Sequence, residues 1–383
     1  MISEARRDRA GLADLALELA QRSAAFKASL PQSMVPALAA LVRSMNCYYS
    51  NLIEGHDTHP VDIERALEGD YSADPVQRNL QLEAKAHIAV QRWIDEGGLA
   101  DPPCSVAAVR TIHCRFYDKL PDAMRWVENP QDGQRHPVLP GALRSHDIKV
   151  GRHVGISPGA VPRFLDRFEE AFARLGKADS IVGAAAAHHR LLWIHPFLDG
   201  NGRAVRLMSH ASLLGLLDTG ALWSVSRGLA RSVADYKRHL AACDEPRDGD
   251  LDGRGTLSEA ALTDFTVFFL RACLDQVAFM ESLMQPGRLR ARIQLWAEEE
   301  VRVGALPAKS AAILDALLYR GELQRADLVG LLDVEERQAR RLIQPLFEKG
   351  IVAAEHKRAP IRLAFPATLA ARLMPGLFPD RGG

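Results

Sequence analysis

Twelve consecutive residues, HPFLDGNGRAVR, gather a histidine, a carboxylate, a Gly-Asn-Gly turn and two arginines between His195 and Arg206. A histidine with an ordinary pKa can accept a proton near neutral pH, and a carboxylate beside an anion site can hold Mg²⁺. The two glycines and the asparagine interrupt a helical pattern, so we expect a turn that opens a new helix. The backbone N–H groups and the dipole at such a helix start bind phosphate.

The two arginines favour a phosphate ligand. Arg203 and Arg206 lie three positions apart, on one side of the expected helix, where their charge opposes the helix dipole. A polyphosphate would neutralise them, because a guanidinium binds phosphate as a planar fork. Together these parts suit transfer from a nucleoside triphosphate to a hydroxyl. Singly, each has a structural alternative: His195 as a packed residue, the glycines as a plain turn, and Asp199 as a helix cap.

The run resembles the Fic family signature, HPFxDGNGRxxR, at every fixed position. Members of this family are mostly helical and commonly transfer AMP from ATP to a serine, threonine or tyrosine hydroxyl of a target protein. The resemblance implies that His195 deprotonates the target hydroxyl. It also implies that Asp199 holds Mg²⁺ and that Phe197 anchors the loop in the core.

The resemblance implies an ATP site in the rest of the run. Gly200, Asn201 and Gly202 would form the nest around the α- and β-phosphates. Arg203 would also bind phosphate, and Arg206 would position the γ-phosphate.

A second motif, SNLIEG, ends an apolar helical pattern at residues 50–55. Glycine is typical of a helix C-terminus, and a glutamate there needs a cationic partner. The stretch resembles the inhibitory motif of Fic proteins, [S/T]xxxE[G/N], at Ser50, Glu54 and Gly55. That resemblance implies that Glu54 pairs with Arg206, blocks the γ-phosphate site and makes the chain autoinhibited from its N-terminal side. His56 stands where relatives often have asparagine, and the alternative for Glu54 is an ordinary surface residue.

The segment DIKVGRHVGI (147–156) alternates apolar and polar residues about a glycine, which predicts a β-hairpin. It resembles the flap of the Fic family, with Ile148, Val150 and Gly151 at its centre. Such a hairpin could hold an extended target segment by strand addition. The alternative is an ordinary surface hairpin.

Two further residues lie at positions of interest. Tyr236, in DYKRHLAACD (235–244), sits where the family has a tyrosine near the adenine, so we list it as a nucleotide contact with helix packing as the alternative. His188, seven residues before His195, is expected to be a packed, hydrogen-bonded histidine.

Apolar residues recur at helical spacing through most of the chain, which predicts a mainly α protein. We expect a Fic-fold helical bundle with a β-hairpin flap, and loops at 121–146 and 244–257. Helices are expected at 8–28, 33–48, 79–96, 105–120, 160–176, 180–194 and 259–284.

Three short amphipathic helices and a small hairpin after residue 305 predict a winged helix-turn-helix module. We expect an N-terminal helical region that carries the inhibitory helix at 1–104 and a Fic catalytic core at 105–285. A linking helix at 286–305 and the winged module at 306–383 would follow. Arginines and glutamates mix in the third helix of the module, which favours protein contact or homodimer formation over DNA binding.

The composition narrows the class of protein. Lysine plus arginine and aspartate plus glutamate both number 48, so the net charge of zero favours neither nucleic acid nor membrane as a non-specific partner. The five cysteines form no CxxC pair, and we find neither a signal peptide nor a transmembrane stretch, which together predict a cytoplasmic protein.

Alternatives remain for the reaction. The same site could remove AMP, or transfer phosphate or phosphocholine, although the intact DGNGR core favours AMP. A DNA-binding regulator with a degenerate enzymatic domain is the alternative from another class, and the intact His195 and Asp199 argue against it.

Overall fold

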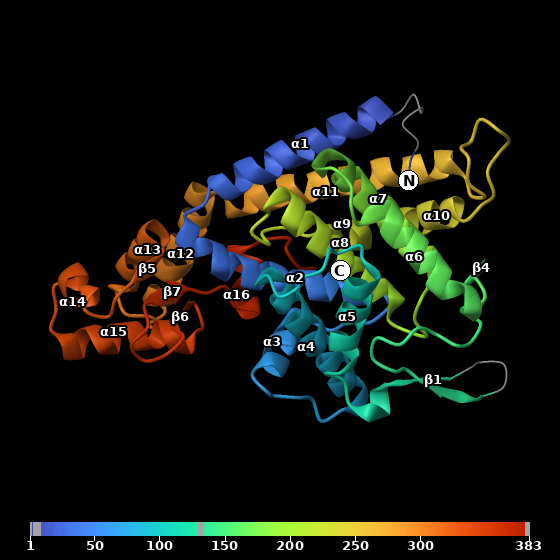
Figure 1. The fold of residues 1–383 in the computed structure, drawn as a ribbon. Coiled ribbons are helices and arrows are strands. Elements are labelled where there is room, and N and C mark those ends of the chain that lie inside the picture. The colour runs from blue at the N-terminus through green and yellow to red at the C-terminus, as the bar shows by residue number, and fades with distance from the viewer. Residues whose placement is uncertain (1, 3–8, 129–132, 380–383) are drawn as a thin grey trace. The chain divides into compact units, whose positions relative to one another are not determined.

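The computed structural model describes residue 2 and residues 9–128 and 133–379 (Figure 1). The chain divides into two compact units. The first comprises residues up to 24 together with 46–276, and the second comprises 25–45 together with 277–383. Three long helices, α1, α2 and α11, run through the points of division.

The first unit is built almost entirely of helices. Helices α1, α2 and α11 each lie partly in this unit and partly in the second. The elements of the first unit are α1 (Arg9–Ala28), α2 (Val35–Ile53), α3 (Pro60–Leu67), α4 (Pro75–Asp95), α5 (Val106–Tyr117), η2 (Asp122–Met124), β1 (Trp126–Glu128), β2 (Arg135–Pro137), β3 (Lys149–Val150), β4 (His153–Val154), η3 (Pro158–Ala160), α6 (Val161–Phe172), α7 (Lys177–Ile194), α8 (Asn201–Leu217), α9 (Val225–Arg231), α10 (Val233–Cys243) and α11 (Glu259–Met284). The expectation of a mainly α protein is confirmed.

The second unit adds short helices and a small sheet. Its elements are η1 (Gln32–Met34), α12 (Pro286–Arg302), α13 (Ser310–Arg320), β5 (Glu322–Leu323), α14 (Asp327–Leu332), α15 (Glu336–Glu348), β6 (Val352–Ala353), β7 (Ile361–Leu363) and α16 (Ala367–Leu373). The strands form one antiparallel sheet in the order β5-β7-β6.

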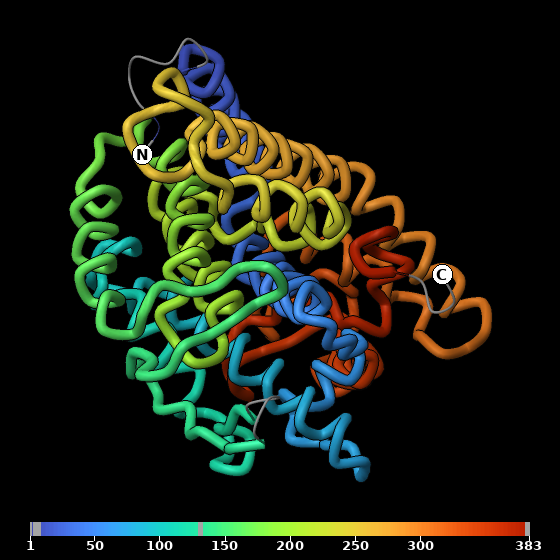
Figure 2. Tube along the Cα trace, turned by 90° about the vertical axis from the view of Figure 1, so that its right-hand side faces the viewer, coloured from blue at the N-terminus to red at the C-terminus, as the bar shows by residue number. Residues whose placement is uncertain are grey.

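Helices α7 and α8 pack against each other more extensively than any other pair of described elements, and α6 lies beside α7 (Figures 1 and 2). Small residues make this close approach available, because Ala184, Ala185, Ala186 and Ala187 are all buried on α7. The loop that joins α7 to α8 carries the His195–Arg206 run, so this helix pair positions the residues expected to do chemistry.

Some elements differ from the expectation. Residues 121–146, expected to be a loop, contain the antiparallel strands β1 and β2, which are too short to show an alternating pattern in sequence. Helices α3 and α9 were not expected, since each spans only two turns or so. The compact units also divide the chain elsewhere than the boundaries at 104/105 and 285/286, because 25–45 groups with the C-terminal residues.

The hairpin expected at 147–156 is present but short. β3 and β4 pair antiparallel, with Lys149 opposite Val154 and Val150 opposite His153. Val150 and Val154 are exposed, at 51% and 69%. The hairpin therefore presents apolar side chains to the outside.

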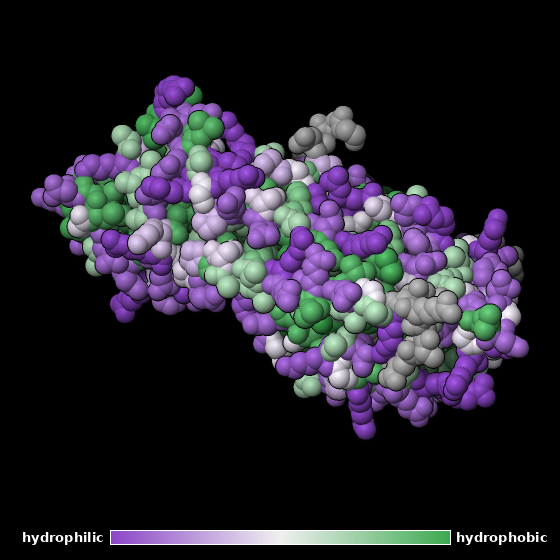
Figure 3. All heavy atoms as spheres, turned by 90° about the horizontal axis from the view of Figure 1, so that it is seen from above, coloured by the Kyte–Doolittle hydropathy of each residue, from purple (hydrophilic) through white to green (hydrophobic). Residues whose placement is uncertain are grey.

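No helix in the described part of the chain is long and apolar enough to cross a bilayer. Hydrophilic residues predominate on the face drawn in Figure 3, where apolar residues form separate small patches.

The packing of α7 generates a first prediction. Ala185→Leu adds volume to a fully buried position, and we expect it to lower the free energy of unfolding by about 1–3 kcal/mol. Ala178→Leu, at an exposed position on the same helix, should change it by less than about 0.5 kcal/mol. Chemical denaturation measures both, and equal effects would contradict the tight α7–α8 packing.

Candidate active site

The run from His195 to Arg206 begins where α7 ends. His195 adopts a left-handed conformation, with φ 51°, and its N–H donates to the Leu191 carbonyl. Few non-glycine residues adopt this conformation, because the side chain crowds the backbone. It turns the chain sharply out of α7, and the following Phe197 is completely buried. Phe197 stacks on His113 of α5, with ring centroids 3.8 Å apart, so the loop is anchored in the core.

The imidazole of His195 is held as a neutral base. Nδ1–H donates to the Leu192 carbonyl over 3.3 Å, which leaves Nε2 as an acceptor. Burial lowers the pKa of His195 to about 4, against the opposing effect of that carbonyl, and nearby His153 and Arg144 lower it further. At neutral pH the ring is therefore unprotonated and able to accept a proton.

Asp199 is oriented from α5. The Tyr117 hydroxyl donates to Oδ2 over 2.6 Å, and His113 Nε2–H donates to the Asp199 backbone carbonyl over 3.1 Å. Burial raises the pKa of Asp199, but Arg203 and the Tyr117 hydrogen bond outweigh burial and lower it, so the carboxyl is ionised. No sequence spacing pointed to Tyr117 or His113, because they reach Asp199 through helix packing.

The glycines of the turn admit close neighbours. Gly200 has φ 76°, and a Cβ there would lie 2.7 Å from the Tyr117 ring. A Cβ on Gly202 would lie 2.1 Å from Glu54 Oε1. No side chain among the described residues caps the start of α8, so its first N–H groups stay available to an anion.

Asn201 serves the loop through its side chain. Its Oδ1 accepts from the Phe197 N–H and its Nδ2 donates to the Phe197 carbonyl, both over 2.9 Å. The side chain is 3% exposed. The expected phosphate contact of Asn201 is therefore left to its backbone N–H, and the side chain shapes the turn.

Arg203 lies among carboxylates. Its Nη1 is 2.9 Å from Glu83 Oε2 and its Nη2 is 3.6 Å from Asp199 Oδ2. Glu83, on α4, also contacts His56 Nδ1 over 2.8 Å. Nε and Nη1 of Arg203 are buried and have no hydrogen-bond partner among the described residues, since the contact of Nη1 with Glu83 is an ion pair only, so this side chain keeps unused donors. Nothing in the sequence around Glu83 pointed to this role, since its helix is an ordinary amphipathic one.

Arg206 meets the second motif. Its Nε donates to Ser50 Oγ over 2.8 Å, and its Nη2 donates to the Ser50 carbonyl over 3.1 Å and to Glu54 Oε1 over 2.5 Å. The Arg206 side chain is 2% exposed. Burial raises the pKa of Glu54, but Arg206 outweighs burial and lowers it, so the carboxylate stays ionised. Gly55 follows α2 with φ 87°, as a helix C-terminus requires.

The flap is tied to the same loop by Arg144. This side chain is 4% exposed, and its guanidinium donates to the carbonyls of His195 (2.7 Å), His146 (3.0 Å) and Ile156 (2.5 Å). The Arg144 N–H donates to the Pro196 carbonyl. The Arg144 side chain thus joins both ends of the hairpin to the backbone of His195. On the hairpin itself, Ile148 is half-buried, and Val150 and Gly151 are exposed.

Tyr236 is placed differently from its expected nucleotide contact. The side chain is 2% exposed, and its hydroxyl bonds to His188 Nε2 over 2.7 Å. His188 also bonds to Ser209 Oγ over 2.8 Å. The structure thus packs Tyr236 between helices, as the alternative expects, and the nucleotide contact stays a prediction. His188 is packed and hydrogen-bonded, as expected.

The residues of the candidate site could hold a magnesium ion only together with a phosphate ligand. Within the described part of the chain, no three histidine, cysteine, aspartate or glutamate side chains converge on a metal site. Asp199 is a single carboxylate at the start of α8, with a side chain 48% exposed. Mg²⁺ is usually bound by one or two carboxylates together with substrate phosphates, and Asp199 suits that arrangement.

The sequence model of the Fic/DOC family matches residues 103–213, which include the whole run from His195 to Arg206. The chain carries a Fic/DOC-family domain at these residues. The protein adenylyltransferase Fic of Nematostella vectensis is 36% identical over 196 residues, 49% of this chain and 41% of that protein. The corresponding protein of Drosophila erecta is 34% identical over 84 residues, 21% of this chain and 17% of that protein. The matches thus span less than half the length of each of these relatives.

Solved Fic structures share the fold of this chain. A Fic family protein from Desulfovibrio desulfuricans G20 aligns with a TM-score of 0.54 at 19% identity, covering 92% of this chain and 95% of that one. Fic-1 (residues 134–508) from C. elegans aligns with a TM-score of 0.53 at 16% identity, covering 72% of this chain and 74% of that one. The expected Fic fold is confirmed.

The environment of His195 generates a prediction for its titration. Because burial lowers its pKa to about 4, nitrogen-15 NMR should show a neutral ring with the proton on Nδ1 from pH 7 down to pH 5. The expected protonation midpoint, about 4, lies well below the ordinary value of about 6.5. His195→Ala assigns the signal, and a midpoint near 6.5 or a proton on Nε2 would contradict the geometry.

The role of Arg144 is testable by hydrogen exchange. Arg144→Ala removes a charged donor from several carbonyls, and we expect a loss of about 3 kcal/mol in unfolding free energy. Amides of 147–156 should also exchange faster. Arg152→Ala, on the exposed turn of the same hairpin, is the matched control and should leave exchange unchanged.

Proposed function

We propose that this Fic protein transfers AMP from ATP to a serine, threonine or tyrosine hydroxyl of a target protein, and to itself. The observation that carries the proposal is the arrangement at the start of α8. A neutral histidine base, an ionised Asp199 and uncapped backbone N–H groups meet at one turn. The adenylyltransferase names of the relatives in Nematostella and Drosophila support the same reaction.

In the proposed step, Nε2 of His195 accepts the proton of the target hydroxyl. The hydroxyl oxygen forms a bond to the α-phosphorus of ATP, the bond between that phosphorus and the bridging oxygen breaks, and pyrophosphate leaves. The N–H groups at Gly202 and its neighbours would stabilise the added negative charge, as donors at a helix start do. Arg203 would contribute its unused Nε donor.

Asp199 would hold Mg²⁺ in this proposal, and the bound ion would neutralise charge on the phosphates of ATP. Tyr117 keeps the carboxylate oriented through its 2.6 Å hydrogen bond.

We further propose that Glu54 inhibits the reaction. Arg206 donates to Ser50 and Glu54 at once, and the carboxylate lies against Gly202. The same guanidinium cannot also bind the γ-phosphate, and a carboxylate at that place would repel it. ATP would then bind unproductively until Glu54 moves away.

Removal of AMP is a second candidate, because the Glu54 carboxylate lies over the start of α8, where it could align a water molecule. Transfer of phosphate or phosphocholine uses the same base and is distinguished by the mass added to the target.

We propose that the C-terminal elements form a winged helix used for protein contact. The third helix, α15, carries the ion pair Arg340–Glu336, and Arg362 of β7 pairs with Glu322. Such paired charges leave less free positive charge for a phosphate backbone. The five free cysteines support a reducing compartment such as the cytoplasm.

Release of Arg206 generates the main functional prediction. We expect Glu54→Gly to raise AMP incorporation from labelled ATP, in cell lysate and into the protein itself, by on the order of ten- to a hundredfold. The reason is that the variant removes the carboxylate that competes with the γ-phosphate. Glu54→Gly combined with His195→Ala should lose roughly two to four orders of magnitude of that signal.

Glu68→Gly is the matched control, because Glu68 is an exposed glutamate at the end of α3. It should leave incorporation at the wild-type level. Mass spectrometry should find AMP on the modified protein, and equal incorporation in the wild type and Glu54→Gly would refute the inhibitory role.

A further inference from the structure

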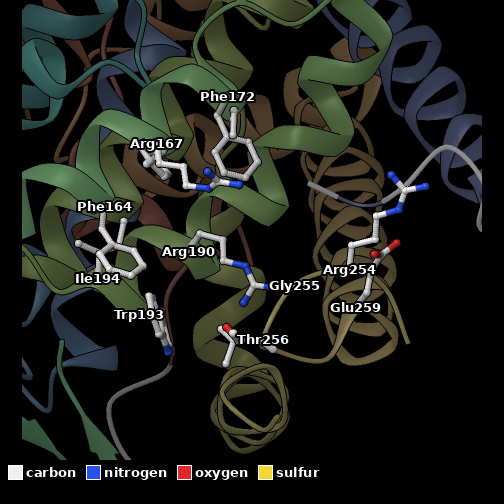
Figure 4. Close-up of a pocket in the computed structure, with 13 residues that line it drawn as sticks. Phe164, Arg167, Phe172, Arg190, Trp193, Ile194, Arg254, Gly255, Thr256 and Glu259 are labelled. Atoms are coloured by element: carbon white, nitrogen blue, oxygen red, sulfur yellow. The ribbon is translucent and has the colours of Figure 1, made fainter. Parts of the chain in front are cut away.

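A separate hollow of about 400 Å³ lies beside the Fic core motif, between α6, α7 and the loop that leads into α11 (Figure 4). None of the residues assigned to the candidate active site lines it. Its volume falls within the range of roughly 300–1,000 Å³ typical of ligand sites. The hollow is therefore large enough for one or two side chains and too small for a folded domain.

Aromatic side chains form its apolar wall. Phe164 of α6 and Trp193 of α7 pack with ring centroids 5.5 Å apart, and further phenylalanines of α6 continue the wall. Rigid aromatic surface of this kind holds apolar side chains at little entropic cost.

Positive charge surrounds this wall. Arg167, Arg190 and Arg254 line the hollow, and Arg167 and Arg190 extend from neighbouring helices toward it (Figure 4). Within the described residues, none of the three has a carboxylate within ion-pair distance. Glu259 is the one acidic residue of the lining, so the charge is unbalanced.

Among the arginines that line the hollow, Arg190 gives the strongest reason to expect an anionic ligand. Its hydrogen-bond contacts are with neutral groups, with Nη1 3.2 Å from His189 Nδ1 and 3.4 Å from the Cys243 carbonyl. Burial lowers the pKa of Arg190, and the nearby Asp244 and Glu259 oppose this effect without outweighing it. A partly buried guanidinium gains most from an anionic partner that also displaces water.

The hollow is linked to the flap. His153 of β4 donates from Nε2 to the Trp193 carbonyl over 2.9 Å, and its Nδ1 lies 3.3 Å from Asp244. Asp244 also pairs with His189, the neighbour of Arg190. A chain that adds to the flap would therefore have this hollow within reach of its neighbouring residues.

We propose that the hollow binds an acidic segment of a protein that carries an aromatic side chain, with the ring on Trp193 and Phe164 and the carboxylates on Arg167 and Arg190. The role of the hollow as a docking site for the protein that receives AMP rests on the proposed function. Peptide binding itself is measured without ATP, so failure of binding and failure of AMP transfer are separate results.

The probe is a fluorescein-labelled peptide, Asp-Glu-Phe-Glu-Asp, titrated with the full chain and followed by anisotropy. We expect saturable binding that Arg167→Glu weakens at least tenfold. Arg174→Glu, an exposed arginine just beyond α6 and outside the hollow, carries the same charge change and should stay within twofold of wild type. Arg190→Gln gives a second test of peptide binding. Circular dichroism and thermal melting check that this variant folds.

Peptides in which alanine replaces phenylalanine, or lysines replace the acids, should each bind at least tenfold more weakly. Equal losses in Arg167→Glu and Arg174→Glu would overturn the proposal, since they would indicate general charge attraction. Absence of saturable binding would overturn it as well. Phenylacetate that binds as tightly as the peptide, or ATP that displaces it competitively, would reassign the hollow to a small molecule.

Discussion

The buried guanidinium of Arg206 is the constraint around which the site is organised. A charge with 2% of its side chain exposed must be paired, because an unpaired buried charge costs several kcal/mol. In this structure Ser50 and Glu54 provide the partners, and they come from the end of α2. The end of α2 is thereby held against the start of α8. Any anion that takes Arg206 must replace these partners, which makes their contact suitable for a switch.

The loop from His195 to Gly200 depends on a second set of contacts that reach it from outside the motif. His113 stacks on Phe197 and bonds to the backbone of Asp199, while Tyr117 bonds to its carboxylate. Arg144 binds the carbonyl of His195 and both ends of the flap. His195, Asp199 and the flap are thus positioned by residues that lie outside the motif. This explains why the left-handed backbone of His195 can persist.

Much of this could be predicted from sequence because it is local. Helical periodicity located α6, α7 and α11 to within a few residues, and the glycines located the turn before α8. The short strands β1 and β2 escaped prediction because three residues hold no pattern. Glu83 and Tyr117 also escaped, since an amphipathic helix shows which face is polar but not which distant side chain it meets. Tyr236 was assigned by position, and in the structure its hydroxyl bonds to the buried His188.

The sequence by itself determined the chemical groups of the site and their order, since His195, Asp199 and the glycine turn are contiguous and their types limit the chemistry. It also placed Ser50 and Glu54 at a helix end, and the resemblance to a family motif suggested their partner. Only the tertiary structure decided which groups meet and in what charge state. The low pKa of His195 and the pairing of Arg203 with Glu83 arise from burial and packing. Desolvation and contact depend on every neighbour in space, and those neighbours are scattered along the chain.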